Sequence, residues 1–336
     1  MSTNNSKLLY IFIALVLVYA IFLLFNTEDD RTFSKELIKF QKDKVDKILL
    51  YPKAENQTEI QFTKIDSNWT VSKGNIKSEI NPSTAQRIID EISAIVPTKV
   101  ASTKKEKWEQ YQVTDSSATK IVLLDKENKL LELYLGKFSI RMRKPMPGMP
   151  QQMGQQQNNM TGVNYFRVAG GDKTYSCDGM ISMSINQKFD NWRNSTIVKA
   201  NKNDITYISL NSETKNYSIQ KAGENWEQTG IELDSLGIDS FLNSISNLRS
   251  NKFADDFDEN STNTYKLSLK GNNMNDISLE IFVLEPTNNT DNISVDNPND
   301  DNSKETKNNT EYIIKSSQNQ GTYLKLESNR LDFLGL

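Results

Sequence analysis

The sequence contains no histidine and only one cysteine among its 336 residues. Without histidine the chain cannot form a Ser-His-Asp triad, a His-ligated zinc or haem site, or an imidazole base for catalysis near neutral pH. The single cysteine, Cys177, excludes an intrachain disulfide and a metal site built from cysteines alone. The sequence therefore supplies no catalytic, cofactor-binding or metal-ligating set, which favours a protein without a reaction of its own.

Excess charge of either sign is also missing, because 40 Lys and Arg oppose 43 Asp and Glu and give a formal net charge of -3. Nucleic-acid binding depends on clustered positive charge, so we expect no nucleic-acid partner. The chain has no Gly-x-Gly-x-x-Gly or P-loop pattern that would hold a nucleotide. Hydrophobic residues make up 36% of the chain, which predicts thin cores with long polar insertions.

One apolar run stands near the start of the chain, from Leu8 to Phe25, and it contains no charge, Gly or Pro. As a helix it would be about 27 Å long, close to the hydrocarbon thickness of a bilayer. No small-x-small cleavage site follows it, so we expect an uncleaved transmembrane helix rather than a signal peptide. Lys7 precedes the run and acidic residues 28–30 follow it, which places residues 1–7 in the cytoplasm and the bulk of the chain outside.

The rest of the chain contains an internal repeat. We expect a stalk at residues 26–44, with a helix from Phe33 to Lys44, then module 1 at 45–195 and module 2 at 203–336. Six short matches occur in the same order in both modules. The matched pairs are 45–50 with 203–208, 68–70 with 225–227, 119–124 with 264–269, 132–135 with 280–283, 165–168 with 312–315, and 173–175 with 321–323.

The pattern inside each module predicts hairpins and one helix. Alternating apolar residues separated by turn residues are typical of antiparallel strands. A helical segment follows Pro82, with Ile88, Ile89, Ile92, Ile95 and Val96 on one face before Pro97. In module 2 the same face consists of Ile238, Phe241, Leu242, Ile245 and Leu248. The expected fold is therefore α+β, a transmembrane helix followed by two antiparallel sheet-plus-helix modules.

Both modules carry a low-complexity insertion at the same hairpin tip, at about 138–163 and about 285–310. We expect both to be flexible, because neither contains enough apolar residues to fold alone. The first insertion contains Met142, Met146, Met149, Met153 and Met160. Clustered thioethers suit Cu(I), but an adaptable contact with a partner is the simpler interpretation of these methionines.

Two further sets of residues are candidate sites. Trp69 and Trp226 occupy equivalent strand positions, as do Tyr165 and Tyr312, and core packing explains them better than a carbohydrate-binding face. Adjacent carboxylates such as Asp255-Asp256 would point apart in a strand, so solvated charge is the expected role.

The arrangement resembles the bacterial domain-of-unknown-function family numbered forty-three forty. The resemblance rests on Leu8 to Phe25, Val45 to Leu50, Asn68-Trp69, Ile88 to Val96, Tyr165 to Tyr175 and Asp190-Asn191-Trp192-Arg193. The usual Tyr-Gly-Leu of that family is here Tyr111-Gln112-Val113. The resemblance implies a protein anchored in the bacterial inner membrane, facing outward, that assists gliding-type ABC transporter subunits. It implies no catalytic residue.

We therefore expect a non-catalytic accessory protein of the cell envelope that binds an ABC-type transporter or export complex. Two alternatives remain open. One is an envelope glycan-binding module, and the other is a hydrolase whose carboxylate pair is assembled only by folding.

Overall fold

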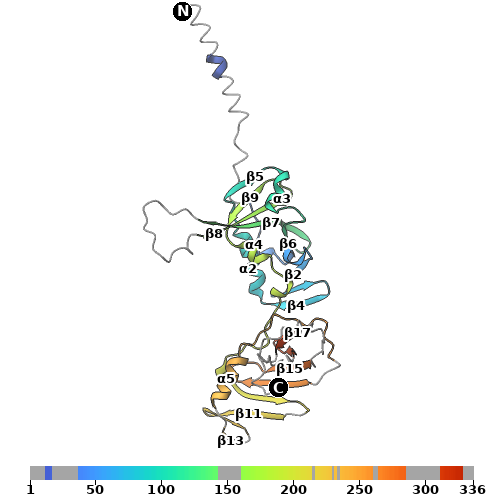
Figure 1. The fold of residues 1–336 in the computed structure, drawn as a ribbon, viewed down its shortest axis with the longest axis vertical. Coiled ribbons are helices and arrows are strands. Elements are labelled where there is room, and N and C mark those ends of the chain that lie inside the picture. Colours follow the sequence, from blue (N-terminus) through green and yellow to red (C-terminus); the bar gives the residue numbers. More distant parts are fainter. Residues whose placement is uncertain are drawn as a thin grey trace, which may run out of the picture. The chain divides into compact units, whose positions relative to one another are not determined.

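The computed structural model describes residues 12–16, 37–142, 160–213, 216–228, 231–232, 235–259, 264–284 and 311–327. The chain forms two compact units, Met1–Trp69 with Pro82–Lys188 and Thr70–Asn81 with Phe189–Leu336 (Figure 1). The second unit begins earlier than the predicted module at 203. The reason is that the connector is hydrogen-bonded into this unit, with the amides of Ile197 and Val198 both donating to the Leu248 carbonyl oxygen, at 2.9 and 3.0 Å.

The first sheet has nine strands in the order β4-β3-β2-β1-β6-β7-β8-β9-β5. The pairings of β1 with β2 and β6, of β7 with β6 and β8, and of β9 with β8 and β5 are antiparallel. The strands are β1 (Lys47–Tyr51), β2 (Ile60–Ile65), β3 (Asn68–Lys73), β4 (Ile76–Ile80), β5 (Lys99–Ser102), β6 (Thr119–Asp125), β7 (Asn128–Met142), β8 (Met160–Val168) and β9 (Thr174–Asp178).

The second sheet has eight strands in the order β13-β12-β11-β10-β14-β15-β16-β17. They are β10 (Ile205–Asn211), β11 (Asn216–Ala222), β12 (Asn225–Gln228), β13 (Ile231–Glu232), β14 (Thr264–Gly271), β15 (Ile277–Leu284), β16 (Glu311–Ser316) and β17 (Asn319–Glu327). Their order repeats that of β4-β3-β2-β1-β6-β7-β8-β9, so the internal repeat is visible as shared topology. The prediction of two antiparallel sheets is confirmed.

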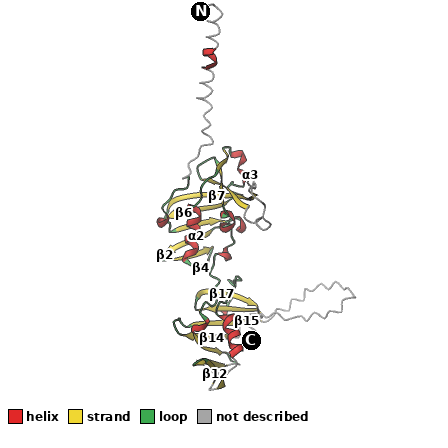
Figure 2. Ribbon diagram, turned by 90° about the vertical axis from the view of Figure 1, so that its left-hand side faces the viewer, coloured by secondary structure: helices red, strands yellow, loops and turns green. Residues whose placement is uncertain are grey.

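Each sheet carries one longer helix at the equivalent point, α2 (Pro82–Ser93) after β4 and α5 (Ser235–Ile245) after β13 (Figure 2). The two other named helices, α3 (Trp108–Tyr111) and α4 (Ile181–Ile185), are short. The regular structure of the described residues therefore consists mainly of β-strands. Single 3-10 turns occur at η2 (Lys42–Lys44), η3 (Lys53–Glu55), η4 (Lys105–Lys107), η6 (Phe189–Asn191) and η7 (Lys202–Asp204).

The helices form because their apolar residues recur on one face. Helix α2 begins at Pro82, as expected, and buries Ala85, Ile88, Ile89 and Ile92. It ends before Val96, which is 51% exposed, so including Val96 in the buried face was wrong. In the second unit the predicted residues are buried in one cluster with strand residues, and burial of each stabilises the fold by about 1.5–3 kcal/mol. They are Ile238, Phe241, Leu242, Ile245 and Leu248.

The predicted stalk helix from Phe33 to Lys44 is wrong over its described part. Residues 37–41 have no regular structure, and only Lys42–Lys44 form a 3-10 turn. The Lys42 ammonium lies 2.8 Å from the Asp90 carboxylate of α2. This contact and the start of β1 at Lys47 agree with the principle that tertiary contacts override a weak helical propensity.

Strand β7 continues as far as Met142, and strand β8 begins at Met160. Residues 138–142 and 160–163 therefore belong to the sheet rather than to the first insertion. The remaining residues 143–159, and all of 285–310, lie outside the described residues. Of the predicted transmembrane helix, the structure describes only residues 12–16, which are helical. No helix among the described residues is long and apolar enough to cross a membrane.

Candidate functional site

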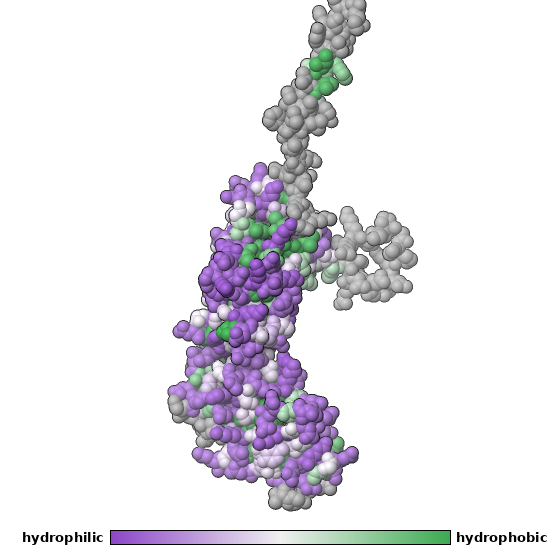
Figure 3. All heavy atoms as spheres, turned by 180° about the vertical axis from the view of Figure 1, so that it is seen from behind, coloured by the Kyte–Doolittle hydropathy of each residue, from purple (hydrophilic) through white to green (hydrophobic). Residues whose placement is uncertain are grey.

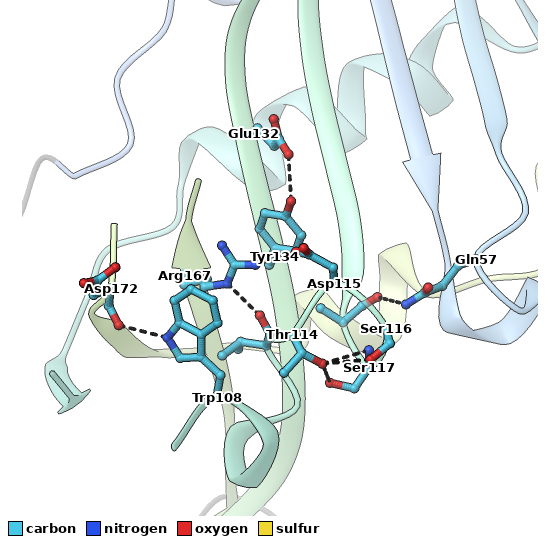
Figure 4. A network of polar contacts seen from close by, with 12 residues as sticks. Gln57, Trp108, Thr114, Asp115, Ser116, Ser117, Glu132, Tyr134, Arg167 and Asp172 are labelled. Carbon is cyan, nitrogen blue, oxygen red and sulfur yellow. Dashed lines mark hydrogen bonds and ion pairs between the residues drawn. The ribbon is translucent and has the colours of Figure 1, made fainter. Parts of the chain in front are cut away.

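Arg167, on β8, is a buried cation in the first unit with 5% of its surface exposed. Its Nε donates to the Val113 carbonyl oxygen and its Nη2 to Asp115 Oδ1, both at 2.7 Å. The guanidinium carbon lies 4.1 Å from the ring centroid of Trp108 and 3.7 Å from that of Tyr134 (Figure 4). The two rings and two oxygen acceptors offset the desolvation of the charge.

Helix α3 covers this face of the sheet. Trp108 begins the helix and donates from its indole Nε1 to the Asp172 carbonyl oxygen at 2.9 Å (Figure 4). Tyr111 ends it, with its ring 4.8 Å from that of Tyr165. Because Tyr165 and Arg167 are two residues apart on a strand, they point to the same face. One short helix therefore packs an aromatic ring against each of them.

Tyr134, which stacks on the guanidinium, is hydrogen-bonded to a second ionisable group of β7, Glu132. Tyr134 Oη donates to Glu132 Oε1 at 2.7 Å, and Lys129 forms an ion pair with the same carboxylate. Burial alone would raise the pKa of Glu132, but the hydrogen bonds from Lys129 and Tyr134 outweigh it and the pKa is lowered. Burial, followed by the hydrogen bond to Glu132, raises the pKa of Tyr134. Glu132 therefore stays ionised and Tyr134 stays protonated around neutral pH.

The same place in the second unit is apolar. Tyr134 stands opposite Arg167 in the first sheet, and Phe282 stands opposite Ile313 in the second. Tyr134 and Phe282 are equivalent, because each lies two residues after the glutamate of a matching segment, Glu132 or Glu280. The residues opposite them, Arg167 and Ile313, are therefore counterparts. A cluster of buried and half-buried residues surrounds Ile313: Ala254, Phe257, Phe282, Leu284 and Tyr323. The second unit therefore has no guanidinium at the position equivalent to Arg167.

The strand register corrects one predicted equivalence. Tyr312 stands opposite Val283, as Phe166 stands opposite Leu135, so Tyr312 corresponds to Phe166 and not to Tyr165. A shift of one residue moves a side chain to the other face of a sheet. Tyr312 and Phe166 are accordingly both buried.

The core interpretation of the matched tryptophans is confirmed. Trp69 is 5% exposed and Trp226 is 6% exposed. Trp226 belongs to the main apolar cluster of the second unit. Neither ring is therefore available as a platform for a sugar.

The Asp190-Asn191-Trp192-Arg193 segment fastens the connector to the second unit. The Arg193 side chain is 2% exposed, and its two terminal nitrogens donate to Asp255 at 2.8 and 2.6 Å. The guanidinium carbon lies 3.7 Å from the Phe253 ring centroid, and a third contact reaches Asp190 at 3.3 Å. The expectation of solvated charge is therefore wrong for Asp255, whose carboxylate neutralises a buried arginine.

A cavity of about 500 Å3 opens in the first unit beside α3 and α4. Lys53 Nζ donates to Gln112 Oε1 at 3.3 Å across it. Asn186 Oδ1 accepts from the Ala54 amide at 2.9 Å and from Thr119 Oγ1 at 3.1 Å. The lining residues are Lys53, Gln112, Ser117, Thr119, Leu135, Gly136, Phe138, Ser182, Met183, Asn186 and Gln187.

Close backbone packing shapes one wall of this cavity. A Cβ on Gly136 would lie 2.2 Å from the Tyr111 carbonyl oxygen and 2.7 Å from that of Gln112, so only glycine fits where β7 passes α3. Gln112 itself has a left-handed backbone with φ of 54° and ends α3. This is the position where the resembled family usually has glycine, the residue that this conformation favours.

An exposed apolar surface, here called the methionine patch, borders the cavity. It consists of Ile140, Met160, Met180 and Met183, which are 59%, 51%, 56% and 53% exposed. Figure 3 shows apolar side chains gathered on the first unit among hydrophilic neighbours. The patch adjoins the cavity because Met183 lines both.

The methionine patch is held on a fixed support. Ile140 pairs with Gly162, and a Cβ on Gly162 would lie 2.9 Å from Met180 Sδ, so α4 lies directly against this hairpin. The buried Asn164 donates to the Gly179 carbonyl oxygen at 2.8 Å and accepts from the Ser182 amide at 3.0 Å. These bonds fix the start of α4, and with it the two methionines.

Sequence reasoning missed both the cavity and the patch. It grouped Met142 and Met160 with the insertion, whereas the two residues pair across β7 and β8. The signal for the patch was the pair Met180 and Met183, three residues apart after Gly179, which is the spacing of one helical face. The cavity had no local signal, because its lining comes from five separate segments.

The buried cysteine and the carboxylates of the described residues form no cluster that could hold a metal ion. Cys177 is buried, and burial followed by the nearby Asp178 raises its pKa to about 12. No group of three or more His, Cys, Asp or Glu residues in the described part of the chain is placed to hold a metal ion. The copper hypothesis for Met146, Met149 and Met153 concerns residues that lie outside the described part.

Comparison with known proteins gives a match to a family model. Neither a curated protein nor a solved structure matches the chain. A family model matches a segment that begins in the first insertion and runs through β8, β9 and α4 into the second sheet as far as β14. This segment includes both Arg193 and Asp255. Residues 152–270 match the family model described as domain of unknown function (DUF4340), which confirms the resemblance drawn from the sequence.

Proposed function

We propose that this protein is a membrane-anchored accessory protein of the cell envelope, which binds a subunit of an ABC-type transporter or export complex through its first unit. Leu8 to Phe25 would anchor it in the inner membrane, with residues 1–7 in the cytoplasm and both units outside. The methionine patch carries the proposal. A contiguous exposed apolar surface is characteristic of protein contacts, and methionine adapts to irregular partner surfaces.

The electrostatics of the described residues support binding rather than catalysis. General acid-base catalysis needs groups whose pKa lies near the working pH. Here burial raises the pKa of Tyr51 and of Cys177 to about 12, and the pKa of Glu132 is lowered despite its burial. These shifts all move away from neutrality, as expected of groups that stabilise a fold.

The test is recovery of the partner from native membranes. Tagged full-length protein would be cross-linked in its membrane, purified in mild detergent and analysed by mass spectrometry. We expect a transporter permease or its ATPase in the wild-type sample. The double substitution Met180→Gln and Met183→Gln should reduce recovery several-fold, because it makes the patch polar while leaving the exposed side chains similar in size.

The matched control is the double substitution Ile65→Thr and Val96→Thr, which changes two exposed apolar residues of the same unit outside the patch. Equal recovery with both double variants would contradict the assignment of the patch. Recovery of the protein alone from wild-type membranes would overturn the transporter assignment and favour a glycan-binding module or a carboxylate-based hydrolase.

A further inference from the structure

We infer that the cavity beside the methionine patch binds a carboxylate of the partner protein, carried next to an apolar residue. The inference rests on the proposed protein-binding function and assigns the chemistry of its contact. Lys53 is the one charged residue among the described residues that line the cavity. An anionic group would therefore meet a cation without an opposing carboxylate.

Two amide nitrogens of the cavity donate to no acceptor among the described residues, those of Asn186 and Gln112. Asn186 uses Oδ1 for the Ala54 amide and Thr119, which leaves its amide nitrogen without an acceptor among the described residues. Gln112 Oε1 accepts from Lys53, and the amide nitrogen of Gln112 also has no acceptor among the described residues. Together with the Lys53 ammonium, these nitrogens suit a carboxylate, which accepts about four hydrogen bonds and donates none when ionised.

The apolar wall defines what accompanies the carboxylate. Leu135, Phe138 and Met183 line the cavity, and Met183 continues into the methionine patch. Phe138 lies close to the same patch, because a Cβ on Gly162 would be 2.8 Å from its ring. A peptide with a carboxylate in the cavity would thus place a neighbouring apolar side chain on the patch. A glycan fits less well, since its hydroxyl groups would find no carboxylate acceptor among these lining residues.

The test uses the full-length protein purified in detergent and a library of short random-sequence peptides with free carboxy termini. Bound peptides would be identified by mass spectrometry after affinity selection. We expect enrichment of peptides with a carboxylate beside an apolar residue. A parallel library with amidated termini distinguishes the source, because binding is lost if the C-terminus supplies the carboxylate and kept if Asp or Glu supplies it.

Two substitutions test the donors. Lys53→Gln removes the charge of an exposed side chain and should weaken binding of the selected peptides about tenfold. Asn186→Asp keeps the acceptor for Ala54 and Thr119 but replaces the free amide with negative charge, so it should weaken binding at least as much. Lys64→Gln, which removes one charge from an exposed position on β2, is the matched control and should leave affinity unchanged.

The inference is overturned if no peptide binds, if bound peptides show no carboxylate enrichment, or if Lys53→Gln binds as Lys64→Gln does. These results are independent of the partner recovery described above. A transporter subunit recovered equally by the wild type and Lys53→Gln would overturn the carboxylate site alone. Carboxylate-dependent peptide binding without a recovered transporter subunit would overturn the transporter assignment alone.

Discussion

At the level of single residues, the buried guanidinium of Arg167 in the first repeat corresponds to the apolar side chain of Ile313 in the second. Ile313 needs only apolar neighbours, whereas Arg167 needs two aromatic rings, a carbonyl oxygen and a carboxylate. Of these partners, Asp115 is 80% exposed, so most of its charge remains solvated. The stacking and the bond to the Val113 carbonyl oxygen should therefore contribute more stability than the ion pair.

We predict that Arg167→Ala lowers the local free energy of unfolding by about 2–3 kcal/mol, because it removes stacking against two rings and a buried hydrogen bond. Asp115→Ala should cost about 1 kcal/mol or less, as for other largely exposed ion pairs. Hydrogen exchange of the β7 and β8 amides in the full-length protein measures both effects. Equal costs for the two substitutions would show that the ion pair, and not the stacking, holds the guanidinium.

Glu132 gives a pH dependence with a defined sign. Its pKa is lowered in the folded chain, so its contribution to stability is present above the unfolded pKa of 4.5 and is lost as the pH falls through the folded pKa. Glu132→Gln keeps an acceptor for Tyr134 but cannot titrate. We predict that this variant loses less stability than the wild type when urea unfolding at neutral pH is compared with unfolding below pH 4.5. The same loss in both proteins would contradict this role of Glu132.

At the scale of elements, the passage of β7 against α3 depends on Gly136. The clash of a Cβ with the Tyr111 carbonyl oxygen involves backbone, which cannot rotate away as a side chain does. We predict that Gly136→Ala lowers the free energy of unfolding by about 1–3 kcal/mol, as for other overpacked sites, and distorts the cavity wall. Gly171→Ala is the control, because its Cβ would lie 3.5 Å from the Val168 carbonyl oxygen, an ordinary contact distance. This substitution should change the free energy of unfolding by less than about 0.5 kcal/mol.

The sequence predicted the elements whose signals are local. Apolar periodicity located the buried faces of α2 and α5, and alternation located the hairpins around Trp69 and Trp226. It failed where packing between distant segments decides. Three features depend on contacts that no short window contains. They are the irregular backbone of residues 37–41, the one-residue shift that separates Tyr312 from Tyr165, and the partner of Asp255.

Nonlocal assembly also explains why the candidate site was not predicted. Lys53, Gln112 and Asn186 are unremarkable polar residues in the sequence, and folding brings them to one cavity. The register of β7 and β8 places Met160 on the same hairpin as Ile140, where it joins Met180. Gln112 adopts a left-handed backbone, the conformation that favours the glycine usual at this position in the resembled family.

At the scale of the whole molecule, the two sheets share one topology but differ in their surfaces. The shared strand order shows that one architecture is used twice. The exposed methionine patch and the cavity beside it belong to the first unit. We therefore assign partner contact to the first unit, whose sheet follows the predicted anchor and stalk in the chain.

The most direct measurement of the central claim is site-specific photo-cross-linking in native membranes, with a photoreactive amino acid at position 183 in the methionine patch. The control places the same group at position 65, an exposed apolar position of the same unit outside the patch. The account predicts a covalent adduct with a transporter subunit from position 183 and none from position 65. Adducts from both positions, or from position 65 alone, would contradict the claim that this patch is the partner contact.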